Sequence, residues 1–200
     1  MAELAYALDL KSNALIGLEG SSPSGAIKRN TMDLKYLNKM HKKLAKRGNA
    51  SSQIVASMAF LGKPMYESFA AGLLSMGNVH APIERACRLF NRPDWPEALV
   101  ELSTIGKRVP GFGSAFCKKE DPIIEEALGH LPMPIIQKIE DITEEVHLLF
   151  NPNLYPNAAL ATAAYAYVND IPPTEAQYLV LQGRLGVWKN IYLTNRRNVL

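Results

Sequence analysis

The 200-residue sequence lacks the features that mark several large classes of protein. It has only two cysteines, Cys87 and Cys117, far apart in the chain, so neither a disulfide framework nor the paired spacing of a zinc site is present. No apolar run approaches the roughly 18 residues of a membrane helix, and the N-terminus has no signal-peptide pattern. We therefore expect a soluble, cytoplasmic protein without a metal site.

The sequence also has no large excess of positive or negative charge. Twenty-two Lys and Arg residues against 19 Asp and Glu give a net charge of +3. One concentration of basic residues lies on one face of residues 32–47, opposite an apolar face formed by Leu34, Leu37, Met40 and His41. Such a face suits nucleic acid or a membrane, but it is more often a solvated surface near a helix C-terminus. We expect neither nucleic acid nor membrane as a partner.

Alternation of apolar and polar residues, the mark of a half-buried strand, is missing throughout. Proline, glycine and asparagine instead separate stretches with helical spacing, which predicts an all-α fold. Residues 1–30 are interpreted as an N-terminal arm, and residues 31–200 as a single helical domain. The predicted helices are 32–47, 50–60, 65–76, 83–90, 96–105, 122–128, 135–149, 158–168 and 175–193.

The chain is organised around a loop at residues 108–122. Pro110, Gly111 and Gly113 favour special backbone conformations, and such a loop brings bare backbone N–H and C=O groups close to a ligand. Its neighbours favour an anionic ligand. They are the cations Lys107, Arg108, Lys118 and Lys119. We interpret the loop as the holder of a phosphate-bearing cofactor.

His80 stands at the start of a predicted helix, between two apolar helices. A helix N-terminus lowers the pKa of a nearby histidine, and the neutral ring can donate a hydrogen bond to a carbonyl. A hydrogen-bonded structural histidine is the alternative. Gly183 and Gly186 flank Arg184 in the last predicted helix and indicate close packing there.

Three blocks resemble the citrate synthase superfamily, which includes the citryl-CoA lyase module of ATP-citrate lyase. The first runs from Asn49-Ala50-Ser51-Ser52 to His80, and the second is Val109-Pro110-Gly111-Phe112-Gly113 with Lys118 and Asp121-Pro122. The third is Pro152-Asn153, an Ala-rich helix and Gly183-Arg184-Leu185-Gly186. The resemblance covers about residues 45–195. It implies an all-α, citrate synthase-like homodimer with shared sites.

The resemblance also implies coenzyme A, bound against residues 109–113 with Lys118, and a carbon–carbon bond made or broken between an acyl-CoA and a carboxylate-bearing oxo acid. By this resemblance His80 would polarise the thioester carbonyl, and Arg184 would bind a substrate carboxylate. The alternative for Arg184 is a helix arginine with a buried carboxylate partner.

Several family residues are replaced. The second histidine is Ser114, the arginine after Asp-Pro is Ile123, and the base aspartate falls on Tyr155. Tyrosine, whose unperturbed pKa is near 10, is a poor base at neutral pH, and fewer cations bind a dicarboxylate less well. These replacements argue against orthodox citrate synthesis.

Two hypotheses follow. The first is an acyl-CoA-dependent lyase or acyltransferase in which Ser114, Tyr155 or Cys117 supply replacement acid–base groups, although a cysteine so placed is more often packed and inert. The second is a catalytically inactive CoA-binding or structural member of the superfamily. The sequence favours the enzyme, because His80, Arg184 and most of the cofactor loop are retained.

Overall fold

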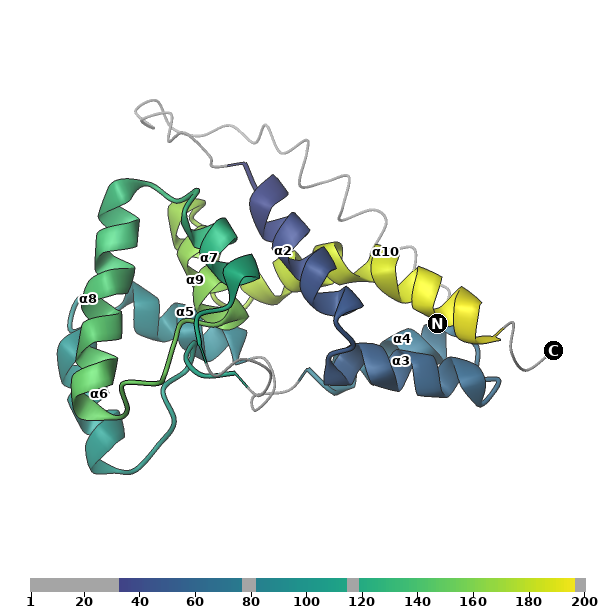
Figure 1. Ribbon diagram of the computed structural model, residues 1–200, viewed down its shortest axis with the longest axis horizontal. Helices are drawn as coiled ribbons and strands as arrows, with labels where there is room; N and C mark the ends of the chain where they lie inside the picture. The colour runs from purple at the N-terminus through teal and green to yellow at the C-terminus, as the bar shows by residue number, and fades with distance from the viewer. Residues whose placement is uncertain (1–32, 77–81, 115–118, 197–200) are drawn as a thin grey trace. The chain divides into compact units, whose positions relative to one another are not determined.

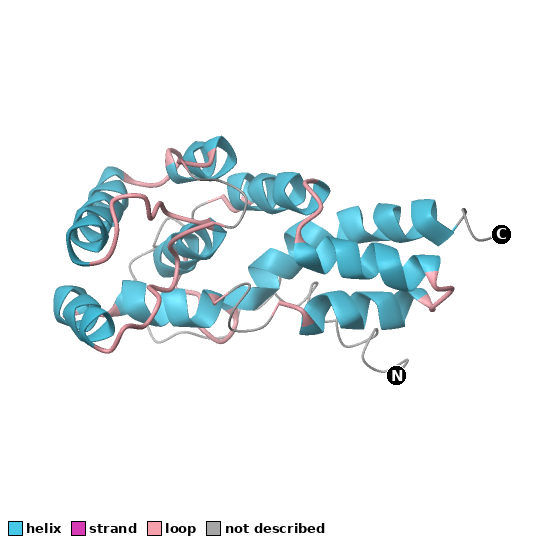
Figure 2. Cartoon of the chain, turned by 60° about the horizontal axis from the view of Figure 1, so that its bottom comes forward, coloured by secondary structure: helices cyan, strands magenta, loops and turns pink. Residues whose placement is uncertain are grey.

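A computed structural model of the chain describes residues 33–76, 82–114 and 119–196. Every regular element in these ranges is a helix, and the only β-type contact is an isolated antiparallel bridge between Phe112 and Pro156 (Figure 2). The predicted all-α fold is therefore confirmed.

The helices follow one another along the chain (Figure 1). They are α2 (Lys35–Lys46), α3 (Ala50–Phe60), α4 (Met65–Leu74), α5 (Ile83–Asn91), α6 (Trp95–Thr104), α7 (Pro122–Leu128), α8 (Met133–Leu149), α9 (Ala158–Val168) and α10 (Ala176–Arg196).

Side-chain caps explain why three of these helices begin where the sequence predicts. The side chains of Asn49, Asp121 and Asn157 accept backbone hydrogen bonds at the first turns of α3, α7 and α9. Each such cap satisfies a donor that the helix itself leaves unpaired, and contributes about 1 kcal/mol.

Some helix ends differ from the prediction. α8 starts at Met133, two residues early, because Pro134 is accommodated in the first turn, where its missing N–H costs nothing. α10 continues past the predicted end at residue 193 to Arg196, and α4 stops at Leu74 instead of residue 76. The glycines at 183 and 186 do not interrupt α10.

The main hydrophobic core lies where α5 packs along α9 and where α2 and α7 close over them. α9 is buried along nearly its whole length, as its run of alanines predicts. A second, smaller core joins α3 and α4 to the C-terminal half of α10 around Val55, Ala59, Trp188 and Tyr192 (Figure 1). α10 therefore contributes to both cores.

Glycines allow close helix contacts at two positions, Gly72 and Gly183. A Cβ at Gly72 would lie 2.7 Å from Val55 Cγ2, and one at Gly183 would collide with His41 Cβ. At Gly186 a Cβ would meet no described atom within 4 Å, so the expectation of close packing at this residue is wrong. None of the helices described here is long and apolar enough to cross a membrane.

Candidate functional site

The loop at residues 109–113 is fixed to the segment that precedes α9. The Gly113 N–H donates to Tyr155 O, and the Asn157 N–H donates to Gly111 O, both at 2.9 Å. The Asn157 side chain donates from Nδ2 to Gly113 O at 2.9 Å, and its Oδ1 accepts the Ala159 N–H at the start of α9. One asparagine thus caps a helix and holds the loop.

Both loop glycines are required by the backbone. Gly111 and Gly113 have φ values of +93° and +79°, which side chains rarely adopt. A Cβ at Gly111 would also lie 3.0 Å from Leu160 Cβ on α9. The chain therefore passes close to α9 at this point.

The loop turns its side chains inward. Val109, Pro110 and Phe112 are buried, with Val109 and Phe112 in the main core. Three of the backbone groups that were expected to be available to a ligand already form hydrogen bonds within the chain. They are Gly113 N–H, Gly111 C=O and Gly113 C=O. A ligand at this loop would meet its outer edge near Gly113 and Ser114 more readily than the buried side chains.

Cations flank the loop in the sequence. Lys107, Arg108 and Lys119 are exposed, and none of them forms an ion pair with another residue of the described ranges. Lys118, the lysine assigned to the cofactor, lies outside the described residues, as does Cys117. Exposed cations without acidic partners beside a fixed loop suit an anionic ligand.

Tyr155 is joined to this loop through its backbone. Ser114 is exposed and directly follows Gly113, whose N–H donates to Tyr155 O. The Tyr155 ring packs edge-to-face on His147 of α8, with ring centroids 5.7 Å apart. His147 Nε2 lies 3.0 Å from Leu154 O. Because a carbonyl only accepts, Nε2 is the donor in this hydrogen bond.

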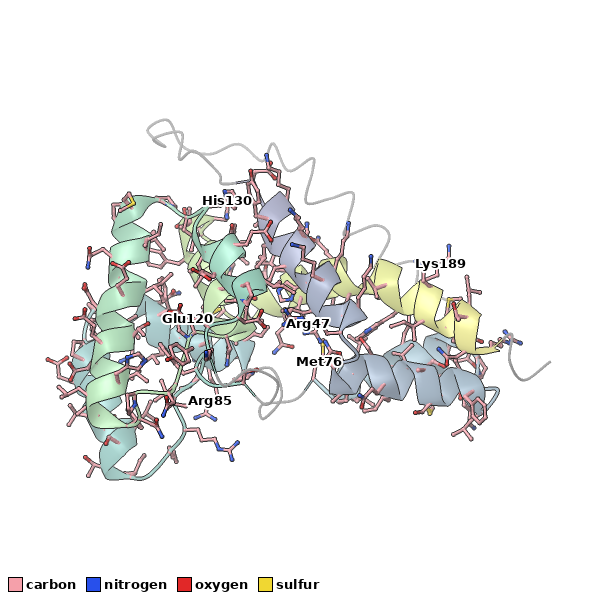
Figure 3. The ribbon with its side chains drawn as sticks, in the orientation of Figure 1. Arg47, Met76, Arg85, Glu120, His130 and Lys189 are labelled. Carbon is pink, nitrogen blue, oxygen red and sulfur yellow. The ribbon has the colours of Figure 1, made fainter. Side chains whose placement is uncertain are left out.

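Arg184 lies elsewhere, on α10 against α3. Its side chain is 8% exposed, and Nη1 donates to Ser51 Oγ at 2.9 Å and contacts Met76 Sδ at 3.1 Å. Met76, labelled in Figure 3, is the last described residue before residues 77–81. Arg184 Nε is buried without a partner, and no carboxylate pairs with this guanidinium within the described ranges.

Burial lowers the pKa of Arg184 to about 10, so it remains a cation at neutral pH. A buried cation is costly unless a counter-charge or several hydrogen bonds satisfy it. The alternative reading of Arg184, a helix arginine with a buried carboxylate partner, finds no such partner here.

His41 is the second unusual polar group beside α10. It is fully buried, and Nε2 lies 3.0 Å from Thr162 Oγ1 on α9. The Thr162 hydroxyl donates to Ala158 O, so the His41 Nε2–H is the donor and Nδ1 is left as a buried acceptor without a partner. Burial, with a contribution from the Arg184 charge, lowers the pKa of His41 to about 3.

The structure brings the blocks of sequence together in pairs. The Arg184 guanidinium reaches Ser51, and Trp188 Nε1 donates to Ser52 Oγ at 3.1 Å, which joins the first block to the last. The loop joins residues 155–157. α9 contacts both the loop and α2. Its cap Asn157 holds the loop, and Thr162, about 7.5 Å further along the helix, bonds His41. No contact links Arg184 directly to the loop in the ranges described.

His80 lies outside the described residues, so its predicted place in the site is a proposal. Three further residues were not singled out by the sequence reasoning: Asn157, His147 and His41. A capping asparagine before an Ala-rich helix was visible in the sequence, but its second role in holding Gly113 depends on a contact 44 positions away. Nothing in the sequence distinguishes His41 from its apolar neighbours.

Comparison with solved structures identifies the fold. The chain matches citryl-CoA lyase from Hydrogenobacter thermophilus with a TM-score of 0.64 and 19% identity, over 92% of this chain and 79% of the other. It matches ATP citrate lyase from Methanothrix soehngenii in complex with citrate and coenzyme A (TM-score 0.65, 18% identity), and the D541A mutant from Methanosaeta concilii in complex with (3S)-citryl-CoA (TM-score 0.65, 18% identity).

The fold is therefore citrate synthase-like, as the resemblance implies. The two ATP citrate lyase matches cover 82% of this chain but only 31% of those longer chains. No protein-family model and no curated protein sequence matches.

Proposed function

We propose that this protein binds an acyl-CoA and makes or breaks a carbon–carbon bond between it and a carboxylate-bearing oxo-acid partner, in the manner of a citryl-CoA lyase and not of an orthodox citrate synthase. The observation that carries the proposal is Arg184, a buried cation without a carboxylate partner in the described part of the chain. In a fold shared with proteins solved with citrate and citryl-CoA, a substrate carboxylate is its natural partner.

Coenzyme A would be held at the loop of residues 109–113. The exposed cations Lys107, Arg108 and Lys119 support this placement, and Lys118 is assigned the same role by the resemblance. The phosphates would face these cations, while Gly111 and Gly113 keep the loop in the conformation that Asn157 holds.

The chemistry is written here in the cleaving direction. A base removes the proton from the hydroxyl group of a 3-hydroxyacyl-CoA, the adjacent carbon–carbon bond breaks to form the oxo acid, and its electrons pass to the thioester as an enolate. Protonation of the enolate carbon gives the shorter acyl-CoA. His80 would stabilise the enolate oxygen, and Tyr155 and Ser114 would supply the acid–base groups.

Calorimetry with wild-type protein and an Arg184→Lys variant tests the role of Arg184. Lysine keeps a positive charge but loses the planar fork that binds a carboxylate in two places. We expect citrate affinity to fall roughly tenfold or more, since a charged hydrogen bond contributes about 1.5–3 kcal/mol, while CoA affinity changes little.

An Arg184→Gln variant serves as the second substitution, and circular dichroism checks that both fold. Equal losses of citrate and CoA affinity would point to a structural role for Arg184. If wild-type protein binds CoA but no carboxylate, the inactive CoA-binding alternative is supported and the lyase proposal fails.

The homodimer with shared active sites is part of the same proposal and rests on the fold resemblance alone. Sedimentation velocity at micromolar protein concentration measures it directly. A species of twice the mass of the 22.1 kDa chain is expected. A monomer across the whole concentration range would contradict it.

A further inference from the structure

A groove separate from Arg184 runs between α7 and α8. It encloses about 420 Å³. The two helices that form its walls pack on different neighbours. α7 packs on α2 and α9, whereas α8 packs on α6. The turn at residues 129–132 connects the walls at one end, and Pro156 and His147 line the other. Glu120, one of its lining residues, is labelled in Figure 3.

The floor of the groove is apolar. Ile124 and Leu128 come from α7, and Ile136 and Ile139 from α8. These residues recur at three- and four-residue spacing, so each helix contributes one continuous stripe. The lining of α8 continues from Ile136 to His147, about 16 Å or three helical turns, and beyond Ile139 it consists of Glu140, Thr143, Glu144 and His147. The groove is therefore long enough for an elongated partner that has both an apolar and a polar part.

The rim of the groove is acidic on both sides. Glu120 and Glu125 line one wall, and Glu140 and Glu144 line the other. All four are exposed, and none forms an ion pair with any residue that the structure describes. No lysine or arginine lines the groove. Like charges facing each other across an apolar floor repel and are not compensated from within the described chain.

Neighbouring carboxylates, by contrast, are paired. Glu126, next to Glu125 on α7, receives hydrogen bonds from Lys39 and Lys43 of α2. Asp121, which also lines the groove, is bonded by Arg47 at 2.6 Å. The basic face of α2 therefore compensates the side of α7 that faces it and leaves the groove side acidic, in a chain whose net charge is +3.

We propose that this groove is a docking site for a basic amphipathic helix of a partner protein. Apolar side chains of the helix would cover Ile124, Ile136 and Ile139, and lysines or arginines on its flanks would face the four glutamates. Helices recognised in this way present anchors at i, i+3, i+4 and i+7, which matches the stripes of the two walls. The charge of the rim excludes the phosphates of coenzyme A from the same groove.

Fluorescence anisotropy with the full chain tests the proposal. The probe is a labelled 18-residue model peptide with leucines on one helical face and lysines on its flanks, compared with a scrambled peptide of identical composition. A Glu140→Gln/Glu144→Gln double variant removes two rim charges without changing side-chain size. A Thr143→Arg variant places a cation in the groove, because Thr143 lines it on α8.

The amphipathic peptide is expected to bind. The Glu140→Gln/Glu144→Gln variant weakens its binding about tenfold, since two exposed charge pairs contribute up to about a factor of ten, and Thr143→Arg weakens it because the added cation repels the lysines of the peptide. Asp141→Asn, on α8 but outside the groove lining, is the matched control and leaves the affinity unchanged. Equal binding of the scrambled peptide, or unchanged binding to both groove variants, would overturn the proposal. Failure of the amphipathic peptide to bind the wild-type chain would also overturn it.

Discussion

Asn157 is the residue that joins the local structure of the site to its helix. Its side chain donates to Gly113 O and accepts from the Ala159 N–H, so the loop and the first turn of α9 are held by the same group. The two bonds can be separated by substitution, because aspartate keeps the accepting oxygen and loses the donor.

In an Asn157→Asp variant we expect the fold to be nearly as stable as wild type, since the cap is kept, while coenzyme A affinity falls as Gly113 is released. Asn157→Ala removes the cap as well, and its free energy of unfolding drops by a further 0.5–2 kcal/mol or so. Urea unfolding and calorimetry measure the two effects. Asn49→Asp, a capping asparagine on α3 away from the loop, is the control, and equal loss of CoA affinity in that variant would refute the loop-specific role.

His41 gives a prediction of pH dependence. Its pKa is about 3 in the folded protein and near 6.5 when unfolded, because burial disfavours the charged ring. Between these values the unfolded state binds more protons, so the free energy of unfolding falls as pH is lowered from about 6.5 towards 3. One such group changes the free energy of unfolding by up to about 1.4 kcal/mol per pH unit.

A His41→Gln variant lacks this titration and keeps an N–H that can reach Thr162. Its free energy of unfolding is therefore expected to fall less steeply than that of wild type below pH 6.5. Guanidinium unfolding at a series of pH values compares the two slopes. Identical slopes would show that His41 is not buried in its neutral form.

α10 carries two glycines, Gly183 and Gly186, whose surroundings can be compared within one helix. A Cβ at Gly183 collides with His41 Cβ and would lie 3.3 Å from Asn38 O, whereas at Gly186 there is no described atom within 4 Å. Gly183→Ala is expected to destabilise the protein by about 1–3 kcal/mol through overpacking. Gly186→Ala is expected to stabilise it by about 0.5–1 kcal/mol through better helix propensity. Thermal or urea unfolding measures the change in stability of each variant. If both variants were stabilised, or both destabilised, the packing described here would be contradicted.

The helix boundaries were largely predictable, because their signals are local. Asn49, Asp121 and Asn157 each cap a helix from a position adjacent to it, and α3, α7 and α9 match the predicted ranges. The start of α8 was missed because a proline can either end a helix or lie in its first turn, and the sequence reasoning chose the first option.

The contacts that build the candidate site were not predictable from residue patterns. Arg184 meets Ser51 from 133 positions away, and Trp188 meets Ser52 from 136. Only the resemblance to a family placed these blocks in one site, and it did not reveal that Arg184 has no carboxylate partner among the residues that the structure describes. Such a distinction depends on packing among α2, α3 and α10.

At the scale of the whole molecule, the division into an arm at residues 1–30 and a domain at residues 31–200 is still a prediction. Deletion of the first 30 residues is expected to leave the helix content per residue, the cooperativity of unfolding and the affinity for coenzyme A unchanged. Far-ultraviolet circular dichroism, thermal unfolding and calorimetry on the shortened chain test it. Loss of cooperative unfolding would show that the arm belongs to the domain.

Two surfaces of opposite charge character lie on the same chain. Exposed cations beside residues 109–113 favour an anionic ligand, while the groove between α7 and α8 carries four glutamates without ion pairs in the described residues. The groove adjoins the candidate site, because Glu120, Asp121, His147 and Pro156 line it. The proposals for coenzyme A and for a basic helix nevertheless concern ligands of opposite charge, so each can fail without the other.

The central claim, chemistry on an acyl-CoA, is tested most directly by exchange of the acetyl methyl protons. The protein is incubated with acetyl-CoA in D₂O, and deuterium in the methyl group is followed by NMR. The proposal predicts protein-dependent incorporation that is abolished in a His80→Ala variant whose CoA affinity is retained. Saturating, calorimetrically verified binding of acetyl-CoA with no incorporation above the protein-free rate would contradict it.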